Sequence, residues 1–291
     1  MRCRTTRSAA GSRNGRLPEA AVALTIREAL VGASGVLERA GCETPRLDAE
    51  LLLADALQVG RARLVLEADL PLDGVAAERF ATLVAHRAAR EPVAYILGRK
   101  EFRHITLAVD PRVLIPRPET ELLVEVGLKL SARARVVDVG TGSGAVALAL
   151  KDERPDLAIT ATDASEEALA VARANAERLR LDVGFAQADL LRGLEGPFDA
   201  VLANLPYVET GAELAPEIAR HEPASALYAG TDGLDVIRRL VTMLDGIPLV
   251  ALEIGADQAA SVRALLEGVG FGPIEILGDL AGHDRVVLAQ R

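Results

Sequence analysis

From Arg135 to the C-terminus, short apolar runs alternate with segments whose apolar residues recur at helical spacing. We expect strands at residues 135–139, 158–163, 183–188, 198–203, 249–254, 274–277 and 285–289, and helices near 143–151, 165–179, 234–244 and 258–269. Strands that alternate with helices of this length are typical of a doubly wound, mostly parallel sheet. The chain is therefore predicted to be an α/β protein with a seven-stranded sheet.

Residues 22–90 have apolar residues at helical spacing throughout. They are predicted to form a small helical domain that begins at a capping box of Thr25 and Glu28. A basic stripe on this domain would suit the docking of a partner protein. The following charged side chains are expected to face solvent on its helices: Glu43, Asp48, Glu50, Arg87 and Arg90.

Two further segments differ in character from this domain. Residues 91–121 contain helix-breaking prolines and the alternating Ile105, Leu107 and Val109, which predicts a linker that carries a β-hairpin before the sheet domain of residues 122–291. Residues 1–21 carry five arginines and lack the apolar core of a secretory signal. We expect a disordered tail; an organelle transit peptide and a start codon assigned too far upstream are the alternatives.

The composition excludes several functions. The 291 residues include 33 basic and 42 acidic side chains, a net charge of −9 that repels nucleic acid, and eight aromatic residues are too few for a base-stacking surface. The longest charge-free stretch, residues 139–150, is shorter than the ~20 residues of a membrane span. The two cysteines form no Cys-x-x-Cys pair and no metal site is predicted, which favours the cytoplasm.

A glycine-rich turn follows the first predicted strand of the sheet. Its sequence is Asp138-Val139-Gly140-Thr141-Gly142-Ser143-Gly144, and a helix is expected to begin within it. Glycines permit a tight turn and close approach of a ligand, and a helix N-terminus offers free N–H groups. A nucleotide-like ligand is expected here, although the spacing is not that of dinucleotide enzymes. The alternative is a strand-to-helix turn without a ligand.

Two further acidic residues end predicted strands of the same sheet. Asp163 lies just over 20 residues beyond the glycines, where a carboxylate can accept both hydroxyls of a ribose. The alternative is that Asp163 only caps the next helix. Asp189 and the backbone of Leu190 could read an adenine edge.

The sequence Asn204-Leu205-Pro206-Tyr207 follows the fourth strand and should lie at the same edge of the sheet. An amide nitrogen is a poor nucleophile, so an enzyme that alkylates it must hold both N–H hydrogens. The Asn204 Oδ1 and the Leu205 carbonyl can be those two acceptors, Pro206 stiffens the turn, and Tyr207 can lie against the planar group. The alternative is an ordinary turn.

From Leu24 onward the sequence resembles the release-factor glutamine methyltransferases of the HemK type. The resemblance rests on the turns above and on segments specific to that family: residues 92–98 with Glu101-Phe102, residues 113–121, residues 222–227 with Asp232-Gly233-Leu234, Glu253-Ile254-Gly255, and residues 279–285. It implies a Rossmann-like methyltransferase sheet and methyl transfer from S-adenosylmethionine, which leaves S-adenosylhomocysteine. The implied substrate is the glutamine of the Gly-Gly-Gln loop of class I release factors.

The resemblance also implies roles for individual residues. The cofactor would be bound by Gly140, Thr141, Gly142, Ser143, Gly144, Asp163, Asp189, Leu190 and Asn204, and Arg117, Glu119 and Thr120 would close over its methionine end. The catalytic segment would be Asn204, Leu205, Pro206 and Tyr207. The family usually has a proline where this chain has Leu205, which keeps the needed carbonyl but loosens the turn. We expect a cytoplasmic monomer that binds neither nucleic acid nor a membrane.

Other functions remain as alternatives. An N6-adenine methyltransferase would use a similar Asn-x-Pro-Tyr turn. A related enzyme that methylates a glutamine of a large-subunit ribosomal protein would differ mainly in its N-terminal domain. A nicotinamide-dependent oxidoreductase conflicts with the glycine spacing. A non-enzymatic adenosine-binding module would not require residues 204–207.

Overall fold

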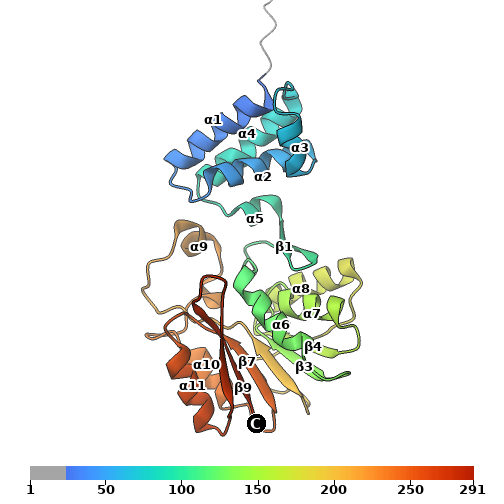
Figure 1. Cartoon of the computed structure of the whole chain (residues 1–291), viewed down its shortest axis with the longest axis vertical. Coiled ribbons are helices and arrows are strands. Elements are labelled where there is room, and N and C mark those ends of the chain that lie inside the picture. Colours follow the sequence, from blue (N-terminus) through green and yellow to red (C-terminus); the bar gives the residue numbers. More distant parts are fainter. Residues whose placement is uncertain (1–23) are drawn as a thin grey trace, which may run out of the picture. The chain divides into compact units, whose positions relative to one another are not determined.

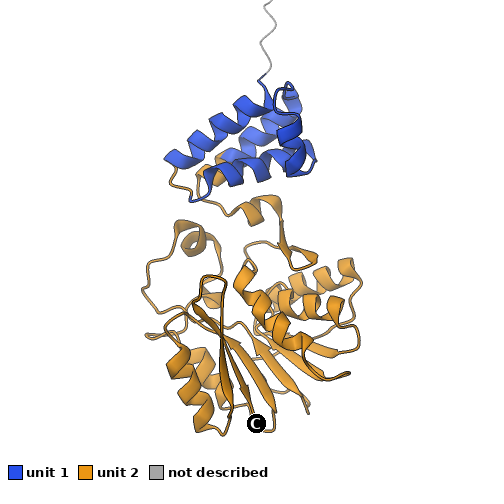
Figure 2. Cartoon of the chain, viewed as in Figure 1, with its two compact units in different colours: residues 1–39, 43–84 blue, residues 40–42, 85–291 orange. Residues whose placement is uncertain are grey.

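The computed structural model describes residues 24–291, so the predicted tail of residues 1–21 lies outside the described residues. The chain divides into two compact units (Figure 2). The first contains the described residues up to Arg39 together with Glu43–Val84, and the second contains Ala40–Cys42 and Ala85–Arg291. Within residues 24–291, no helix is both long enough and apolar enough to cross a bilayer.

The first unit is helical, as its apolar spacing predicts. It contains α1 (Ile26–Arg39), α2 (Pro45–Leu57), α3 (Arg61–Leu66) and α4 (Gly74–Ala88), whose last turn belongs to the second unit. The predicted capping box is confirmed: the Glu28 N–H donates to Thr25 Oγ1 at 3.2 Å, and the Thr25 N–H donates to Glu28 Oε2 at 2.9 Å.

The prediction that the charged side chains of residues 22–90 face solvent is wrong for two of them. Asp48 is 4% exposed, and its carboxylate accepts a hydrogen bond from the Thr44 hydroxyl at 2.8 Å. Arg87 is 5% exposed, and together with Arg90 it binds the Glu217 carboxylate within the second unit. Helical spacing identifies an apolar face but not the polar partner that permits burial of a charge, which is a hydroxyl four residues away for Asp48 and a carboxylate 130 residues away for Arg87.

The second unit is a seven-stranded sheet with helices on both faces (Figure 1). Its strands are β3 (Arg135–Val139), β4 (Ala158–Asp163), β5 (Gly184–Gln187), β6 (Ala200–Ala203), β7 (Leu249–Glu253), β8 (Ile274–Gly278) and β9 (Asp284–Gln290), in the spatial order β5-β4-β3-β6-β7-β9-β8. The first five run parallel, and β9 is antiparallel to β7 and β8. The predicted doubly wound, mostly parallel sheet is confirmed.

Alternate residues of the strands enter two separate cores. On one face Val136 and Leu202 pack in a cluster with residues of α6 (Glu121–Leu128), α7 (Ala145–Glu153) and α8 (Glu166–Leu179). On the other face Val137 and Val201 pack with residues of α10 (Asp235–Val241) and α11 (Ala259–Gly268). In the sheet, β3 lies between β4, which follows it in the chain, and β6, which comes later. The strand order therefore reverses direction between β3 and β6. Ligands bind to such sheets at the carboxyl ends of the two strands that flank this switch point.

The predicted hairpin is also present, formed by β1 (Arg99–Phe102) and β2 (Ile105–Ala108). Four short elements near prolines were not expected from the sequence: α5 (Val93–Leu97), η1 (Pro118–Thr120), α9 (Pro216–His221) and η2 (Ala224–Ala226). Each begins at or just after a proline, which is compatible with the first turn of a helix although it breaks a helix interior.

Candidate active site

The turn between β3 and α7 leaves its backbone open to a ligand. Gly140 and Gly142 adopt φ angles of +72° and +55°, which residues with side chains rarely adopt, and a Cβ atom at Gly142 would meet nothing within 4 Å. Asp138 holds the turn, because its Oδ2 accepts the Thr141 hydroxyl at 2.6 Å. Burial raises the pKa of the Asp138 carboxyl group to about 6.

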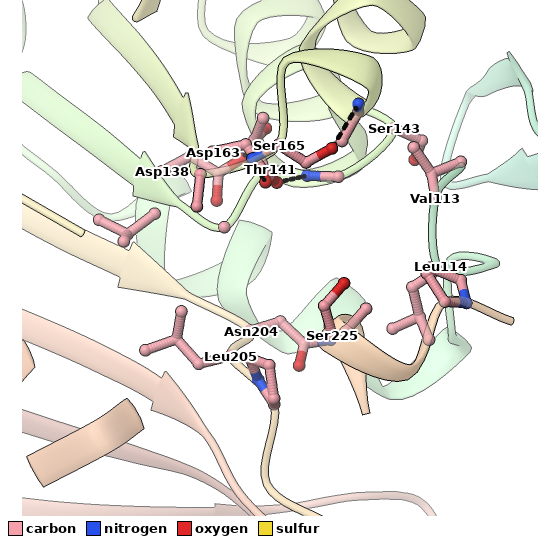
Figure 3. Close-up of a pocket in the computed structure, with 18 of the residues that line it drawn as sticks. Val113, Leu114, Asp138, Thr141, Ser143, Asp163, Ser165, Asn204, Leu205 and Ser225 are labelled. Atoms are coloured by element: carbon pink, nitrogen blue, oxygen red, sulfur yellow. Dashed lines mark hydrogen bonds between the residues drawn. The ribbon is translucent and has the colours of Figure 1, made fainter. Parts of the chain in front are cut away.

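Asp163 joins the glycine turn to the start of the next helix. Its Oδ2 accepts the Gly142 N–H and its Oδ1 accepts the Ser165 N–H, both at 2.9 Å (Figure 3). The interpretation of Asp163 as only a helix cap is wrong, since Ser165 caps α8 by accepting the Ala168 N–H at 3.2 Å. Each Asp163 oxygen retains a second lone pair that a ligand hydroxyl could use.

The segment after β5 carries two of the predicted cofactor residues. Leu190 is buried with φ +60°, a conformation that is strained for a leucine, and such strain is concentrated at functional sites. The Asp189 carboxylate accepts two hydrogen bonds from Arg239 of α10, at 2.5 and 2.6 Å. An adenine edge would therefore compete with Arg239, and recognition by Asp189 stays a prediction.

Asn204 follows β6, which pairs with β3 so that Ala203 lies opposite Val139. The Asn204 Nδ2 donates to the Thr120 hydroxyl at 3.0 Å. Contact of Thr120 with the cofactor stays a prediction, and the structure adds that Thr120 binds the proposed catalytic amide. Among the described residues, none donates a hydrogen bond to Asn204 Oδ1, so this acceptor is available to a ligand.

Leu205 packs the Asn204 turn against the glycine turn. It is 4% exposed, and its Cδ2 would lie 3.1 Å from a Cβ atom at Gly140. The absence of a side chain at Gly140 therefore makes room for Leu205. The sequence predicted that Leu205 supplies a carbonyl acceptor in place of a stiffening proline, but it did not predict this side-chain contact.

The backbone carbonyl of Tyr207 contacts two residues that come later in the chain, Gln258 and Gly233. Gln258 Nε2 donates to this carbonyl at 3.0 Å, and Gln258 Oε1 accepts the Gly255 N–H at 2.9 Å. A Cβ atom at Gly233 would lie 2.1 Å from the same carbonyl oxygen, so only glycine fits there. These contacts give a physical role to Gly233 and Gly255, for which the sequence offered only a resemblance.

The two turns border one cavity of about 660 Å³. Its lining includes most of the predicted site: Thr120, Gly140, Thr141, Gly142, Ser143, Asp163, Asp189, Leu190, Asn204, Leu205 and Pro206. Four predicted residues are not part of this lining: Arg117, Glu119, Gly144 and Tyr207. Figure 3 shows Asn204 and Leu205 on one side of the cavity and Asp163 and Ser165 on the other.

The cavity is also bordered by Val113, Leu114 and Pro116 and by Pro223, Ser225 and Ala226, and Glu222 links these two segments. Its Oε1 accepts the Arg117 guanidinium at 2.5 Å, and its Oε2 accepts the Ile115 N–H at 3.3 Å. The Tyr95 hydroxyl fixes the first segment by donating to the Val113 carbonyl at 2.6 Å. Sequence reasoning did not predict a role for Glu222, although a glutamate beside Pro223 in a family-specific segment was a usable signal.

Comparison with known proteins defines the class. The family described as "PrmC N-terminal domain" matches residues 28–98, and "Methyltransferase small domain" matches residues 118–226. A crystal structure of the hMettl16 catalytic domain in complex with a MAT2A 3′UTR hairpin has a TM-score of 0.54 at 17% identity, covering 72% of this chain and 81% of that chain, which shows a shared fold. The doubly wound sheet is thus that of a methyltransferase domain.

Two bacterial relatives define the family more closely. A release factor glutamine methyltransferase of Mycolicibacterium smegmatis is 41% identical and covers 91% of this chain and 98% of its own length. Another of Pseudomonas aeruginosa is 45% identical and covers 84% of this chain and 92% of its own length. The chain belongs to the release factor glutamine methyltransferase family.

Proposed function

We propose that the protein transfers a methyl group from S-adenosylmethionine to the N5 nitrogen of the glutamine in the Gly-Gly-Gln loop of class I release factors, in the cytoplasm. The observation that carries this proposal is the Asn204 amide beside the glycine-turn cavity, with its nitrogen tied to Thr120 and its oxygen available. This arrangement suits a ligand that has N–H groups to donate.

The cavity has the features that the proposed cofactor requires. Its volume of about 660 Å³ suits a nucleoside-sized ligand, and Gly142 provides backbone that a ligand can approach closely. Asp163 would accept the ribose hydroxyls, and Leu190 would contact the base. When bound, S-adenosylmethionine supplies an electrophilic methyl group and leaves as S-adenosylhomocysteine.

The chain's own contribution to catalysis is positioning. Asn204 Oδ1 and the Leu205 carbonyl would each hold one hydrogen of the glutamine amide, so that the nitrogen lone pair is directed at the methyl group. Transfer would form an N–C bond in place of the methyl–sulfur bond, and the proton lost from the substituted nitrogen would pass to water. The methyl donor is already activated, so orientation and electrostatic complementarity supply the rate enhancement.

The test is an incubation of the purified protein with methyl-labelled S-adenosylmethionine and one candidate substrate at a time. The substrates are a class I release factor, the same factor with its loop glutamine replaced by alanine, the large-subunit ribosomal protein, and DNA. We expect label on the unaltered release factor only. Label that persists on the alanine variant, or that appears only on the ribosomal protein or on DNA, would contradict the proposal.

We further propose that the helical region of residues 22–90 docks the release factor and that residues 91–121 link it to the methyltransferase domain of residues 122–291. The match of residues 28–98 to a family-specific N-terminal domain supports this division, because general methyltransferase function needs no such domain. The protein is proposed to act as a monomer without nucleic acid or a membrane as partner.

A further inference from the structure

Glu222 is a buried acidic residue that the reaction as described does not use. It directly follows α9, it is 6% exposed, and both of its carboxylate oxygens have partners. Oε1 accepts the Arg117 guanidinium at 2.5 Å, and Oε2 accepts the Ile115 N–H at 3.3 Å. Burial of a carboxylate lowers stability unless a charged partner and hydrogen bonds compensate it, and both are present here. Such a buried pair beside the cavity calls for an explanation.

The segment that Glu222 binds is held by side chains. Residues 113–117 lie between β2 and η1 and belong to no helix or strand. A buried backbone N–H outside regular structure needs another partner, and for Ile115 this partner is Glu222. At the start of the segment, the Tyr95 hydroxyl donates to the Val113 carbonyl at 2.6 Å. The position of the segment therefore depends on these two side chains.

The contacts of Glu222 lie one residue away from the cavity lining in both segments. Ile115 and Arg117 flank Pro116, and Pro223 directly follows Glu222. Both prolines line the cavity, whereas Glu222 does not. One carboxyl group thus fixes the spacing between two segments that are more than a hundred positions apart in the sequence.

We propose that Glu222 is a positioning residue for cofactor binding: its carboxylate, paired with Arg117, holds residues 113–117 and 223–226 together as one wall of the cavity. The inference rests on the proposed function, which places S-adenosylmethionine in this cavity. A wall that is fixed before the ligand arrives reduces the conformational entropy that is lost on binding, so it strengthens binding without a contact of its own.

The proposal gives Arg117 a task that differs from direct contact with the cofactor. The family resemblance implies that Arg117 closes over the methionine end, where a guanidinium could bind the methionine carboxylate. In the structure Arg117 is not part of the cavity lining, and its Nη2 donates to Glu222. Arg117 therefore acts on cofactor binding through Glu222. The two explanations predict a different dependence on the methionine carboxylate.

The first experiment measures the Kd of S-adenosylmethionine by calorimetric titration of the wild type, Glu222→Gln, Arg117→Leu and the double variant. The NH₂ group of a glutamine cannot accept a hydrogen bond, so Glu222→Gln loses at least one of the two contacts. We expect the Kd to rise about tenfold in each single variant, as for one lost hydrogen bond to a charged group, with kcat at saturating cofactor nearly unchanged.

The double variant should bind no more weakly than the weaker single variant, because both substitutions break one connection. Losses that multiply in the double variant would overturn the proposal. So would a wild-type Kd in Glu222→Gln, or a loss confined to kcat.

The second experiment repeats the titration with decarboxylated S-adenosylmethionine, which lacks only the methionine carboxylate. Arg117→Leu should weaken the binding of both compounds by the same factor. A loss seen only with the intact cofactor would show that Arg117 binds the carboxylate itself, and would overturn its action through Glu222. Arg117→Lys keeps a cation for Glu222 and should recover part of the lost affinity; binding as weak as in Arg117→Leu would contradict the role of the ion pair.

The matched control is Glu153→Gln at the end of α7. Glu153 is likewise paired with an arginine, Arg103, and it lies outside the cavity lining. Its Kd for S-adenosylmethionine should equal that of the wild type. A rise as large as in Glu222→Gln would show only a general effect of losing an ion pair, and would contradict the proposal. The Arg117 side chain is 29% exposed, so Arg117→Leu still tests the proposal if Glu222→Gln does not fold.

The third experiment needs neither cofactor nor substrate, so it distinguishes failure of this inference from failure of the proposed function. Hydrogen exchange of the Ile115 amide is followed by NMR in the wild type and in Glu222→Ala, which removes both acceptors. We expect exchange to be about tenfold faster or more in Glu222→Ala and unchanged in Glu153→Gln. Equal exchange in the wild type and Glu222→Ala would overturn the inference alone. A wild-type protein that binds no S-adenosylmethionine would contradict the proposed function.

Discussion

At the scale of single residues, Asn204 is the proposed catalytic group, because its side-chain nitrogen is bound to Thr120 and its side-chain oxygen is available to a ligand. Asn204→Ala removes the acceptor without touching the glycine turn. We expect kcat to fall by about two orders of magnitude or more, as when a group that acts in the transition state is lost, with little change in cofactor affinity. Turnover assays and calorimetric titration with cofactor check this, and an unchanged turnover would remove Asn204 from catalysis.

Because Gly140 has no side chain, the glycine turn and the Asn204 turn can pack closely against each other. An alanine there would have to adopt φ +72°, and its Cβ would lie 3.1 Å from Leu205. Gly246 offers a matched control, since its φ is +71° and a Cβ there would meet nothing within 4 Å. Backbone strain should lower the free energy of unfolding by about 1–2 kcal/mol in both variants.

Gly140→Ala should lower the free energy of unfolding by more than Gly246→Ala does. It should also weaken cofactor binding, whereas Gly246→Ala should not. Denaturant unfolding and cofactor titration measure the two effects. Equal losses of stability in Gly140→Ala and Gly246→Ala, with equal cofactor affinity, would show that the contact with Leu205 has no influence.

At the scale of secondary-structure elements, the turn after β6 has Leu205 at a position where a proline would restrict the backbone more, and the Leu205 side chain is buried. Leu205→Pro would restrict the backbone on both sides of the replaced residue. We therefore expect kcat equal to or above that of the wild type. The lost packing of a side chain that is 4% exposed should lower the free energy of unfolding by about 2 kcal/mol.

Turnover and denaturant unfolding of Leu205→Pro separate these two expectations. A large loss of kcat in Leu205→Pro would refute the prediction that a stiffer turn preserves activity. It would show that the leucine side chain is needed to maintain the site.

The elements also show where sequence reasoning succeeds. The strands of the sheet and the helices α8, α10 and α11 follow from apolar periodicity, since each buries one regular face. The start of α7 was predicted at residue 143 but lies at Ala145, because Gly144 has φ +86° and cannot continue a helix. The short helices α5 and α9 were not predicted, because a helix of five or six residues is too short to show an apolar periodicity.

At the scale of the whole molecule, two buried carboxyl groups govern how stability responds to pH. The pKa of Asp138 is raised to about 6 and that of Glu253 to about 7, so the folded protein binds more protons than the unfolded chain at mildly acidic pH. Stability should therefore fall as the pH rises from 5 to 8. Asp138→Asn or Glu253→Gln should each reduce this fall by about 1 kcal/mol or more.

Denaturant unfolding at several pH values measures this slope. Asp279 is a suitable contrast, since hydrogen bonds lower its pKa to about 2 and its stabilising effect is complete at pH 5. A slope that is identical in the wild type and in both variants would show that neither buried group ionises in this range.

The division into a helical region and a sheet domain leads to one more expectation. Exchange of residues 22–90 for the equivalent region of a methyltransferase that acts on another protein should change which protein is methylated. Cofactor affinity should stay the same, since the described residues that line the cavity all lie between Pro111 and Arg239. Methylation assays with both substrates and cofactor titration provide the measurement; an unchanged substrate preference would assign recognition to residues 91–291.

The sequence by itself determined the α/β class, the order of strands and helices, and the two turns at one edge of the sheet, because periodicity and turn chemistry are local properties. Only the tertiary structure decided that Thr120 binds Asn204, that Leu205 occupies the space at Gly140, and that Glu253 is buried with the Tyr207 hydroxyl against it. The hydrogen-bonded pairs among these contacts are 84 and 46 positions apart in the sequence. No local pattern encodes such pairs, because they exist only after the strands have packed.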